Sequence, residues 1–439
     1  MNKMIRIGLA SAVSLIAIEA SAGGFGVREQ SATSQGASFA GAATSAAGLS
    51  GMFWNPAVIG EMPGINAEGH FSGIWAAAKL TPTTGTGPLN LTRGGSGNIG
   101  LPALVGSNYG SYQVNDRLFL GISVNAPYGL RTKSEFSWAG QFYGRSSTAF
   151  NMTATPTVAY RLNDWFTIGA GVQISYLKVN LKASTPSAPG PAAAATAFTP
   201  VSSSNMLEGD NWGIGYTLGA TIKPAAGTEI GLGFRSSVHY DLEGQLTLPY
   251  AMIPIKAKVN LPETVTLGVK QKLGQNVTLL GGVEWQNWSR LNRSAIRHAI
   301  VGAPISEISF VYGDGWMFSL GGEYAWNDKL TLRAGLGYEI SPVKDNVRSV
   351  RIPDNDRTWA SIGATYKWNE AMSFDASYTH IFVKDPDVRI VAGHPHHNPA
   401  FGPLANLVAN GKAHVDIFSF AFKYRFDVPK AASAVVTKG

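Results

Sequence analysis

The feature that most constrains this chain is an alternation of apolar and polar residues with a period of two, which extends over about residues 63–426. In residues 165–182, for example, Phe166 and Ile168 fall on one face, and Thr167 between them falls on the other. Successive side chains of a β-strand point to opposite faces, whereas a helix would show a period of 3.6 residues. The pattern therefore predicts an all-β fold.

The alternation divides into about fourteen predicted strands. Tight turns such as Asn163-Asp164 and Asn327-Asp328 alternate with long connections such as residues 183–208 and 386–411. An even number of antiparallel strands with short turns at one end and long loops at the other is typical of an outer-membrane β-barrel. Lipid requires closure, because an open sheet edge would leave backbone groups without hydrogen bonds. The predicted strands are residues 64–81, 99–114, 117–127, 148–162, 165–182, 209–223, 228–248, 257–273, 277–290, 315–326, 329–341, 357–368, 371–385 and 412–426.

A large soluble β-sandwich would alternate in the same way, so composition and the position of aromatic residues decide between the two folds. Only 14% of the residues are charged, against about 25% in an average soluble domain. Aromatic residues gather beside the tight turns, among them Tyr160, Trp165, Trp326, Trp368 and Phe426. Such girdles mark the interfaces of a membrane barrel. We therefore expect a transmembrane antiparallel β-barrel of about 14 strands.

The N-terminus has the pattern of an export signal. Lys3 and Arg6 form a short basic region, residues 7–18 form an apolar core, and Ala20-Ser21-Ala22 fits a cleavage site. The apolar core is too short to cross a bilayer as a helix. We therefore predict that residues 1–22 are a signal peptide and that the mature chain lies in the outer membrane of a Gram-negative cell.

Residues 23–62 differ from the rest of the chain, because they are rich in Gly, Ala and Ser and lack the period of two. They hold too few large apolar residues for a core of their own, and small residues would let the segment pass through a lumen crowded with side chains. We predict an N-terminal hatch, or plug, in the barrel lumen, with a disordered periplasmic tail as the alternative. The barrel is expected over residues 63–426 and a short C-terminal tail over residues 427–439.

Five blocks of residues, in order along the chain, carry a resemblance to a known family. They are Gly24-Phe25 with Ser34-Gln35-Gly36 and Ala40-Gly41-Ala42, Asn55-Pro56-Ala57, Asn260-Leu261-Pro262-Glu263, Trp285-Gln286-Asn287-Trp288-Ser289, and Ser341-Pro342-Val343 with the charged run Arg348–Arg357. In these blocks the chain resembles the FadL-type outer-membrane transporters of long-chain fatty acids and their TodX-like relatives for aromatic hydrocarbons. It departs from the family in lacking acidic residues just upstream of Asn55 and in continuing beyond its last aromatic residue, Phe426.

The resemblance implies a monomeric barrel of fourteen strands that captures a hydrophobic ligand at the extracellular side. It also implies rearrangement of the hatch and sideways exit of the ligand through a gap at a kinked third strand. Here that strand is residues 117–127, and the lateral-opening residues are Asn125, Pro127 and Gly129. Proline has no N–H for the ladder and glycine weakens a strand, which gives a physical reason for a kink.

Basic ligand contacts are implied near the outer end of the fifth predicted strand and after Trp288. A carboxylate ligand needs a cation beside an apolar slot. The match to the family is regional rather than residue by residue, and the candidate ligand-binding cations are Lys178, Lys182, Arg290 and Arg293. The alternative is that these cations bind lipopolysaccharide phosphates at the base of the loops.

Further residues receive roles from the same resemblance. Phe25 resembles a hatch aromatic that lies beside the pocket and moves during transport, with simple packing as the alternative. Asn55, followed by Pro56 and Ala57, resembles the motif whose asparagine pins the hatch to the barrel wall. Five charges of alternating sign suggest a salt-bridged network that holds the hatch, or else a solvated loop: Arg348, Arg351, Asp354, Asp356 and Arg357.

Catalytic or metal chemistry has little support in the sequence. The absence of Cys excludes disulfides, thiol catalysis and Cys-ligated metals. His394, His396 and His397 form a His-rich tract, but the neighbouring Gly393 and Pro399 favour a solvated loop over a metal site. No G-x-S-x-G, Walker A or H-E-x-x-H motif occurs. We expect no enzymatic activity, no cofactor and no metal.

Taken together, the sequence favours passive uptake of hydrophobic small molecules across the outer membrane, with long-chain fatty acids as the first candidate. Aromatic hydrocarbons are the alternative within transport, because a neutral arene needs no cation. A structural or adhesive barrel and a barrel lipase are the readings from other classes. The expected partners are the hydrophobic ligand, outer-membrane lipid and lipopolysaccharide, and the outer-membrane assembly machinery. The net charge of +7 is scattered, so nucleic acid is not expected.

Overall fold

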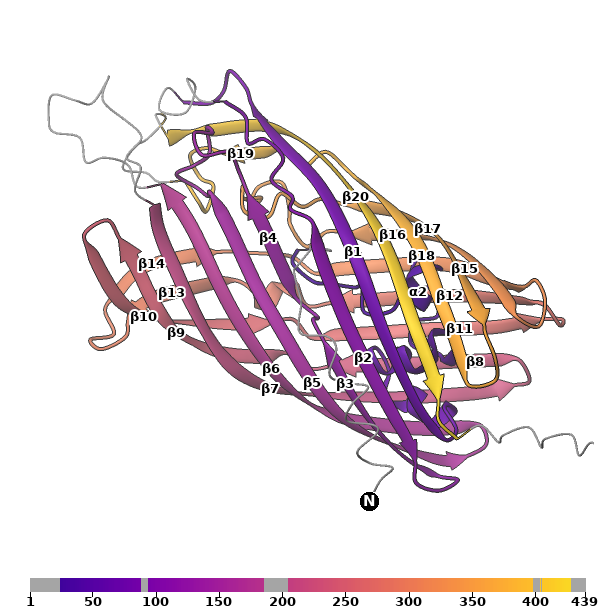
Figure 1. Cartoon of the computed structure of the whole chain (residues 1–439). Helices are drawn as coiled ribbons and strands as arrows, with labels where there is room; N and C mark the ends of the chain where they lie inside the picture. Colours follow the sequence, from indigo (N-terminus) through magenta and orange to yellow (C-terminus); the bar gives the residue numbers. More distant parts are fainter. Residues whose placement is uncertain (1–23, 88–93, 185–203, 398–402, 404, 428–439) are drawn as a thin grey trace, which may run out of the picture.

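The described residues form a closed antiparallel β-barrel of 14 strands (Figure 1), which confirms the predicted fold class. Closure comes from β1 (Ile65–Pro82), which pairs along its length with the last strand, β20 (Leu407–Arg425). The predicted signal peptide and the C-terminal tail beyond Asp427 lie outside the described part of the chain. The computed structural model describes residues 24–87, 94–184, 204–397, 403 and 405–427.

Most barrel strands run unbroken, but six of them are interrupted and consist of two ladder segments: β3 with β4, β8 with β9, β10 with β11, β12 with β13, β14 with β15, and β18 with β19. The remaining strands are β2 (Ala103–Gln113), β3 (Leu118–Asn125), β4 (Gly129–Lys133), β5 (Ser146–Asn163), β6 (Phe166–Ser184), β7 (Ser204–Ala225), β8 (Thr228–Arg235), β9 (Val238–Leu248), β10 (Ala251–Leu261), β11 (Thr264–Leu273), β12 (Val277–Gln286), β13 (Arg293–His298), β14 (Pro304–Ser309), β15 (Gly315–Ala325), β16 (Leu330–Ile340), β17 (Arg357–Lys367), β18 (Met372–Val383) and β19 (Val388–Ile390). A short 3₁₀ turn, η3 (Trp288–Arg290), separates β12 from β13.

The strands extend further toward the long-loop end of the barrel than the alternation predicts. The predicted loops 128–147 and 291–314 contain β4, β13 and β14, and strand pairing of β10 begins at Ala251 rather than at residue 257. In β13 the residues that face away from the lumen are charged, for example Arg293 and Arg297. The outward face of this segment is therefore charged, whereas a lipid-facing strand has an apolar outward face. For this reason the alternation did not identify these segments as strands.

Outward positions of the barrel wall carry large apolar side chains, and inward positions carry small or polar ones. In β7, Ile214 and Leu218 are exposed on the outside, whereas Thr217 and Thr221 are buried on the inside. Trp326 and Trp368, beside two tight turns, are also exposed. This arrangement, apolar outside and polar inside, is the reverse of that in a soluble protein, and contact with lipid requires it. Within the described residues no helix is both long and apolar enough to cross a bilayer.

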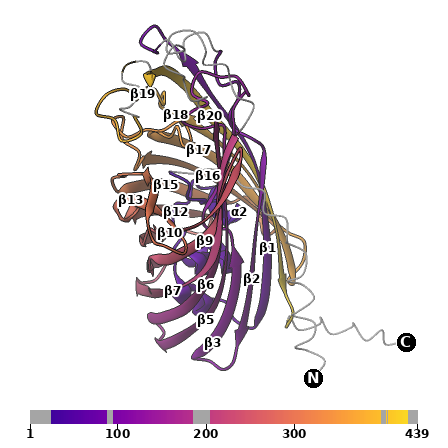
Figure 2. The ribbon, with the colours of Figure 1, turned by 90° about the vertical axis from the view of Figure 1, so that its left-hand side faces the viewer.

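Residues 24–62, here called the N-terminal segment, lie inside the barrel, where Figures 1 and 2 show their indigo ribbon within the ring of strands. Their helical turns are α2 (Ala32–Gln35), η1 (Ser45–Phe53) and η2 (Pro56–Glu61). Almost every residue from 24 to 60 is buried. Small residues make this possible, because bulky side chains could not pass between walls that are themselves lined with side chains.

Glycines on the inner face of the wall let the backbone of the N-terminal segment approach the strands. A Cβ atom on Gly231 of β8 would lie 1.8 Å from the carbonyl oxygen of Ala43, and one on Gly233 would lie 1.7 Å from that of Trp54. A Cβ on Gly219 of β7 would lie 2.0 Å from the side-chain oxygen of Asn55. These glycines therefore define the surface on which the segment is seated.

Buried ion pairs fasten the N-terminal segment to the wall. Arg28 bonds to Glu284 of β12 and lies 3.3 Å from Glu339 of β16. A second group joins the wall strands themselves, with Asp375 of β18 lying 3.0 Å from Lys423 and 3.2 Å from Arg333. Each of these charges has an opposite charge beside it, as buried charges require.

Candidate functional site

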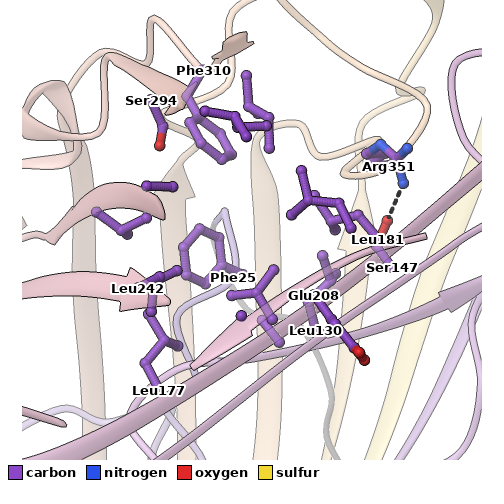
Figure 3. A pocket seen from close by; sticks show the side chains of 18 of the residues that line it. Phe25, Leu130, Ser147, Leu177, Leu181, Glu208, Leu242, Ser294, Phe310 and Arg351 are labelled. Atoms are coloured by element: carbon purple, nitrogen blue, oxygen red, sulfur yellow. Dashed lines mark hydrogen bonds between the residues drawn. The ribbon is translucent and has the colours of Figure 1, made fainter. Parts of the chain in front are cut away.

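An apolar cavity of about 90 Å³ lies toward the long-loop end of the lumen (Figure 3). Its walls are formed mainly by inward-facing residues of eight neighbouring strand segments, β4, β5, β6, β7, β9, β10, β13 and β14. The aliphatic and aromatic lining includes Leu130, Ala149, Leu177, Val179, Leu181, Leu207, Leu242, Ile255, Val259, Ile296, Ile308 and Phe310. A concave, largely apolar site with few polar groups is the usual form of a site for a small hydrophobic ligand.

Phe25 of the N-terminal segment borders this cavity. Its ring packs edge-on against Trp288 at 5.0 Å and Tyr128 at 6.1 Å. The Tyr128 hydroxyl donates to the carbonyl of Pro262 at 3.0 Å, which ties the third barrel strand to the break between β10 and β11. The cavity is therefore bounded by an aromatic cluster to which the N-terminal segment contributes Phe25.

The cavity also adjoins an interruption of the barrel wall. β3 ends at Asn125 and β4 begins at Gly129, and only the β5 side of this strand keeps a continuous partner. On the other side, β2 pairs with β3 over residues 108–113, and the next contact is the isolated bridge between Gly100 and Thr132. Within the described chain, residues 101–107 thus have no ladder partner on this side, which leaves a gap in the hydrogen-bonded wall.

The N-terminal segment covers this gap from within. The amide of Val27 donates to the carbonyl of Pro127 at 2.9 Å, and the amide of Gly129 donates to the carbonyl of Phe25 at 2.8 Å. The Gln30 side chain donates to the carbonyl of Ala126 at 2.8 Å. Backbone groups that a neighbouring strand would otherwise satisfy are here satisfied by the N-terminal segment, as buried peptide groups require.

Polar groups reach the cavity mainly from the loop that joins β16 to β17. Arg351 of this loop donates from Nη1 to the carbonyls of Ser146 and Lys182 and to the Ser147 hydroxyl, each at 3.1 Å. Burial lowers the pKa of Arg351 to about 10, which leaves the group charged at neutral pH. The His396 imidazole also borders the cavity. Burial and the charges of His394 and Arg351 lower the pKa of His396 to about 4, so it is neutral.

The four cations predicted to bind ligand lie outside the cavity. Lys178 and Lys182 alternate with the cavity-lining residues of β6, so their exposed side chains point away from the lumen. Arg290 is paired with Glu263. Arg293 is exposed and lies 3.3 Å from Glu307. Of the residues predicted to contact ligand, the structure brings Phe25 to the cavity.

Asn55 joins the N-terminal segment to the barrel wall. Its Nδ2 group lies 2.9 Å from the carbonyl of Ala43, 3.0 Å from that of Ala220 and 3.1 Å from the Thr221 hydroxyl. Its Oδ1 atom accepts from the amide of Ala57 and so caps η2, which Pro56 begins. An N-cap asparagine followed by proline is a favourable helix start, and here the same side chain also reaches β7.

The charged run of the β16–β17 loop divides into two parts. Arg348 and Arg357 are buried and bonded to Asp345 and Asp354, and Asp356 accepts from the backbone of the loop. Asp354 also accepts from the amide of Gly24 at 2.8 Å, which connects this loop to the N-terminal segment. Arg351 differs from the others in this run, because it turns to the apolar cavity and has no acidic partner within the described residues.

The lining of the cavity was missed from the sequence, although a signal for it exists. Along β6, the larger apolar residues fall on outward positions up to Tyr176 and then change to the inward positions Leu177, Val179 and Leu181. The outward positions that follow carry Lys178 and Lys182 instead. Such a change of phase marks the height at which the wall stops being apolar outside and becomes apolar inside.

The histidine tract is not the solvated loop that the sequence predicts. His394 is buried and His396 borders the cavity, because the loop folds back over the barrel mouth. Among the residues that the structure describes, no group of three or more His, Asp or Glu side chains is placed to hold a metal ion.

Comparison with known proteins gives a consistent result. The family model described as outer membrane protein transport protein (OMPP1/FadL/TodX) matches residues 13–426. A long-chain fatty acid transport protein of Escherichia coli is 27% identical over 410 residues, covering 85% of this chain and 90% of that protein. Outer membrane protein P1 of Haemophilus influenzae is 25% identical over 472 residues, covering 97% and 100%. These relatives are named as transport or outer-membrane proteins rather than as enzymes.

Solved structures show the same fold. A Pseudomonas aeruginosa FadL homologue superposes with a TM-score of 0.79 at 23% identity, covering 92% of this chain and 100% of that one. The Ralstonia pickettii toluene transporter TbuX superposes with a TM-score of 0.66 at 18% identity, covering 91% and 99%. At these identities the likeness concerns the barrel architecture.

Proposed function

The chain belongs to the OMPP1/FadL/TodX family of outer membrane transport proteins, and we propose that it carries hydrophobic small molecules, above all long-chain fatty acids, across the outer membrane by diffusion. The ligand enters from the extracellular side and occupies the apolar cavity. Rearrangement of the N-terminal segment then opens the way to the gap beside β3 and β4. The ligand leaves sideways, into the membrane.

One observation carries this proposal: the apolar cavity and the gap in the wall are separated by the same few residues of the N-terminal segment. Phe25 borders the cavity with its ring and bonds to Gly129, at the interruption, with its carbonyl. A displacement of Phe25 would therefore act on both places at once. This arrangement is what a gate between a binding cavity and a lateral exit needs.

Lateral exit suits an apolar ligand on energetic grounds. Each methylene moved from water to an apolar environment is stabilised by about 0.8 kcal/mol. A ligand that passed through a water-filled pore to the periplasm would lose this stabilisation for its whole tail. A ligand that passes from the cavity to lipid through the wall keeps most of it, so no energy source is required.

The size of the cavity favours a second candidate. About 90 Å³ accommodates a small ring more readily than a complete long acyl chain, so a monoaromatic hydrocarbon is the alternative substrate. The toluene transporter among the structural neighbours belongs to the same fold. A long acyl chain requires the cavity to lengthen when the N-terminal segment moves, and an arene does not.

The first test is uptake by cells that lack their own transporter of this kind. Labelled oleate and labelled toluene are supplied with and without the protein. Faster entry of oleate supports the leading proposal, and faster entry of toluene alone supports the alternative. If neither enters faster than in empty cells, transport of this class is refuted and a structural or adhesive barrel takes its place.

A disulfide lock tests the movement of the N-terminal segment, since the chain has no cysteine of its own. The hydroxyls of Ser38 and Ser361 lie 2.8 Å apart and join the segment to β17, so Ser38→Cys with Ser361→Cys places two thiols within bonding reach. The matched control is Ser72→Cys with Ser419→Cys, which joins β1 to β20 within the wall. Uptake should stop in the oxidised lock, return with reductant, and continue in the oxidised control.

A further inference from the structure

Arg351 borders an apolar cavity and has no acidic partner among the residues that the structure describes. Every Asp and Glu of the sequence except Glu19 lies within the described residues. Among the described residues, Arg351 donates hydrogen bonds to neutral oxygens, namely the carbonyls of Ser146 and Lys182 and the Ser147 hydroxyl. Arg351 is half-buried, and withdrawing a charge from water is costly unless an opposite charge compensates it.

The other arginines of the same loop show that compensation is the rule here. Arg348 bonds to Asp345 at 2.7 Å, and Arg357 bonds to Asp354. Both are almost completely buried. Arg351, three residues from Arg348, is the member of this group whose charge is directed to the cavity instead.

We propose that Arg351 is the anchor for the anionic head of the ligand, which makes the cavity a site for amphiphiles with a carboxylate or similar group and an apolar tail. This inference rests on the proposed function and narrows its substrate class. It differs from the sequence-based expectation, in which Arg351 belongs to a salt-bridged network that holds the hatch, or else to a solvated loop, and the ligand-binding cations are Lys178, Lys182, Arg290 and Arg293.

The guanidinium is arranged to bind such a head. Its three contacts are all made by Nη1, which fixes the side chain, while Nε and Nη2 have no hydrogen-bond partner among the described residues. Two parallel N–H groups match the two oxygens of a carboxylate. The three neutral contacts hold the cation in place without neutralising it.

Neighbouring titratable groups leave the site positive. His396, which also borders the cavity, is neutral at pH 7 because its pKa is lowered to about 4. Glu208 is the carboxylate residue among the described residues that line the cavity, but its side chain lies on the outward face of β7 and accepts from Gln245 at 2.6 Å and from Asn180 at 3.4 Å. Figure 3 shows its carboxylate directed away from Phe25 and Arg351.

The placement of Arg351 also fixes the orientation of the ligand. Figure 3 shows Arg351 at one side of the cavity, above Ser147 and Leu181, with Phe25 and Leu242 across from it. A head held by Arg351 directs the tail toward Phe25 and so toward the gap that Phe25 helps to close. The ligand therefore leaves the cavity tail first, with its charged head released last.

The test compares two ligands with the same tail. Oleate carries a charged head and oleyl alcohol a neutral one, and both are titrated calorimetrically into the purified mature protein held in amphipol. The variants are Arg351→Gln, which removes the charge, and Arg351→Lys, which keeps it but loses the paired N–H groups. Lys256→Gln is the matched control, because Lys256 lies between the cavity-lining Ile255 and Ala257 but faces outward and pairs with Glu243 at 2.9 Å.

We expect Arg351→Gln to weaken oleate binding about 10- to 100-fold, as the loss of charge-assisted hydrogen bonds predicts, and to leave oleyl alcohol binding within about twofold. Arg351→Lys should fall between Arg351→Gln and wild type, and Lys256→Gln should match wild type for both ligands. Retained binding of oleyl alcohol shows that the variant is folded.

Three results would overturn the inference. Equal weakening of both ligands would make Arg351 a purely structural residue, and unchanged oleate binding would place the head elsewhere. In both cases binding to the wild type persists, so the proposed function stands. If the wild type binds neither ligand, the proposed function and the inference fail together.

Discussion

Replacement of Gly233 by alanine should loosen the N-terminal segment without harming the barrel. The added Cβ would lie 1.7 Å from the carbonyl oxygen of Trp54, far inside any contact that real Cβ atoms show. β8 is held on both sides by the ladders to β7 and β11, so the wall cannot retreat. The N-terminal segment must therefore shift, and overpacking of this kind costs about 1–3 kcal/mol.

This cost in free energy can be measured as a faster rate of amide hydrogen exchange. A loss of about 1–3 kcal/mol in the free energy of local opening accelerates exchange roughly 5- to 150-fold where opening is fast and reversible. The assay is exchange followed by mass spectrometry on peptides covering residues 45–61, which include η1 and η2. Peptides from the barrel strands serve as the internal reference, and their exchange should not change.

The matched control is Gly281→Ala in β12. A Cβ at Gly281 would meet nothing within 4 Å, so this variant introduces the same methyl group and the same change in strand propensity without the contact. Its exchange should equal that of the wild type. If Gly233→Ala protects residues 45–61 as well as Gly281→Ala does, the claim that inner-face glycines seat the N-terminal segment is refuted.

Three further predictions concern the same segment. Burial raises the pKa of Glu29 to about 7, above its unfolded value of 4.5. The protonated side chain is therefore favoured in the folded state, so the free energy of unfolding is highest at low pH and falls by at most about 3 kcal/mol as the pH rises from about 4.5 through 7. Glu29→Gln should abolish this pH dependence, measured as amide exchange in residues 24–40. Asn55→Ala removes a helix cap and the bond to β7, and should lower the opening free energy of η2 by about 2 kcal/mol, measured by protease susceptibility of residues 56–61; unchanged susceptibility would contradict it. Arg28→Met leaves Glu284 and Glu339 without their shared cation and should destabilise the protein by about 3–5 kcal/mol, seen as a lower midpoint in tryptophan-fluorescence melts, and an unchanged midpoint would argue against a bracing role for the pair.

The barrel was predictable because the alternation that produces it is visible in each local segment of the sequence. A strand that faces lipid on one side and a lumen on the other must alternate, and segments such as 165–182 show this without help from the rest of the molecule. The structure accordingly agrees with the predicted strands to within a few residues in most of the wall, for example at β6 and β16.

The apolar cavity was less predictable from the sequence, because it depends on which loop residues fold inward. Nothing in the local sequence separates Arg351 from Arg348 and Arg357, which lie in the same charged run. Their roles differ because Asp345 and Asp354 are within reach of two of them and not of the third. Pairing across a folded loop is a tertiary property, and the alternation of sign along the chain does not determine it.

The position of the predicted cations outside the cavity and the cavity that the sequence did not predict have a common cause. Lys178 faces outward directly opposite Asp210 of β7, at the height where Leu177 faces the cavity. A lysine and an aspartate side by side on the outer face cannot lie in hydrocarbon, so this height is above the apolar part of the membrane. There the outside of the wall no longer needs to be apolar, and the inside is free to become so. The change of phase in β6 therefore marks two boundaries at once, the edge of the lipid outside and the floor of the apolar cavity inside.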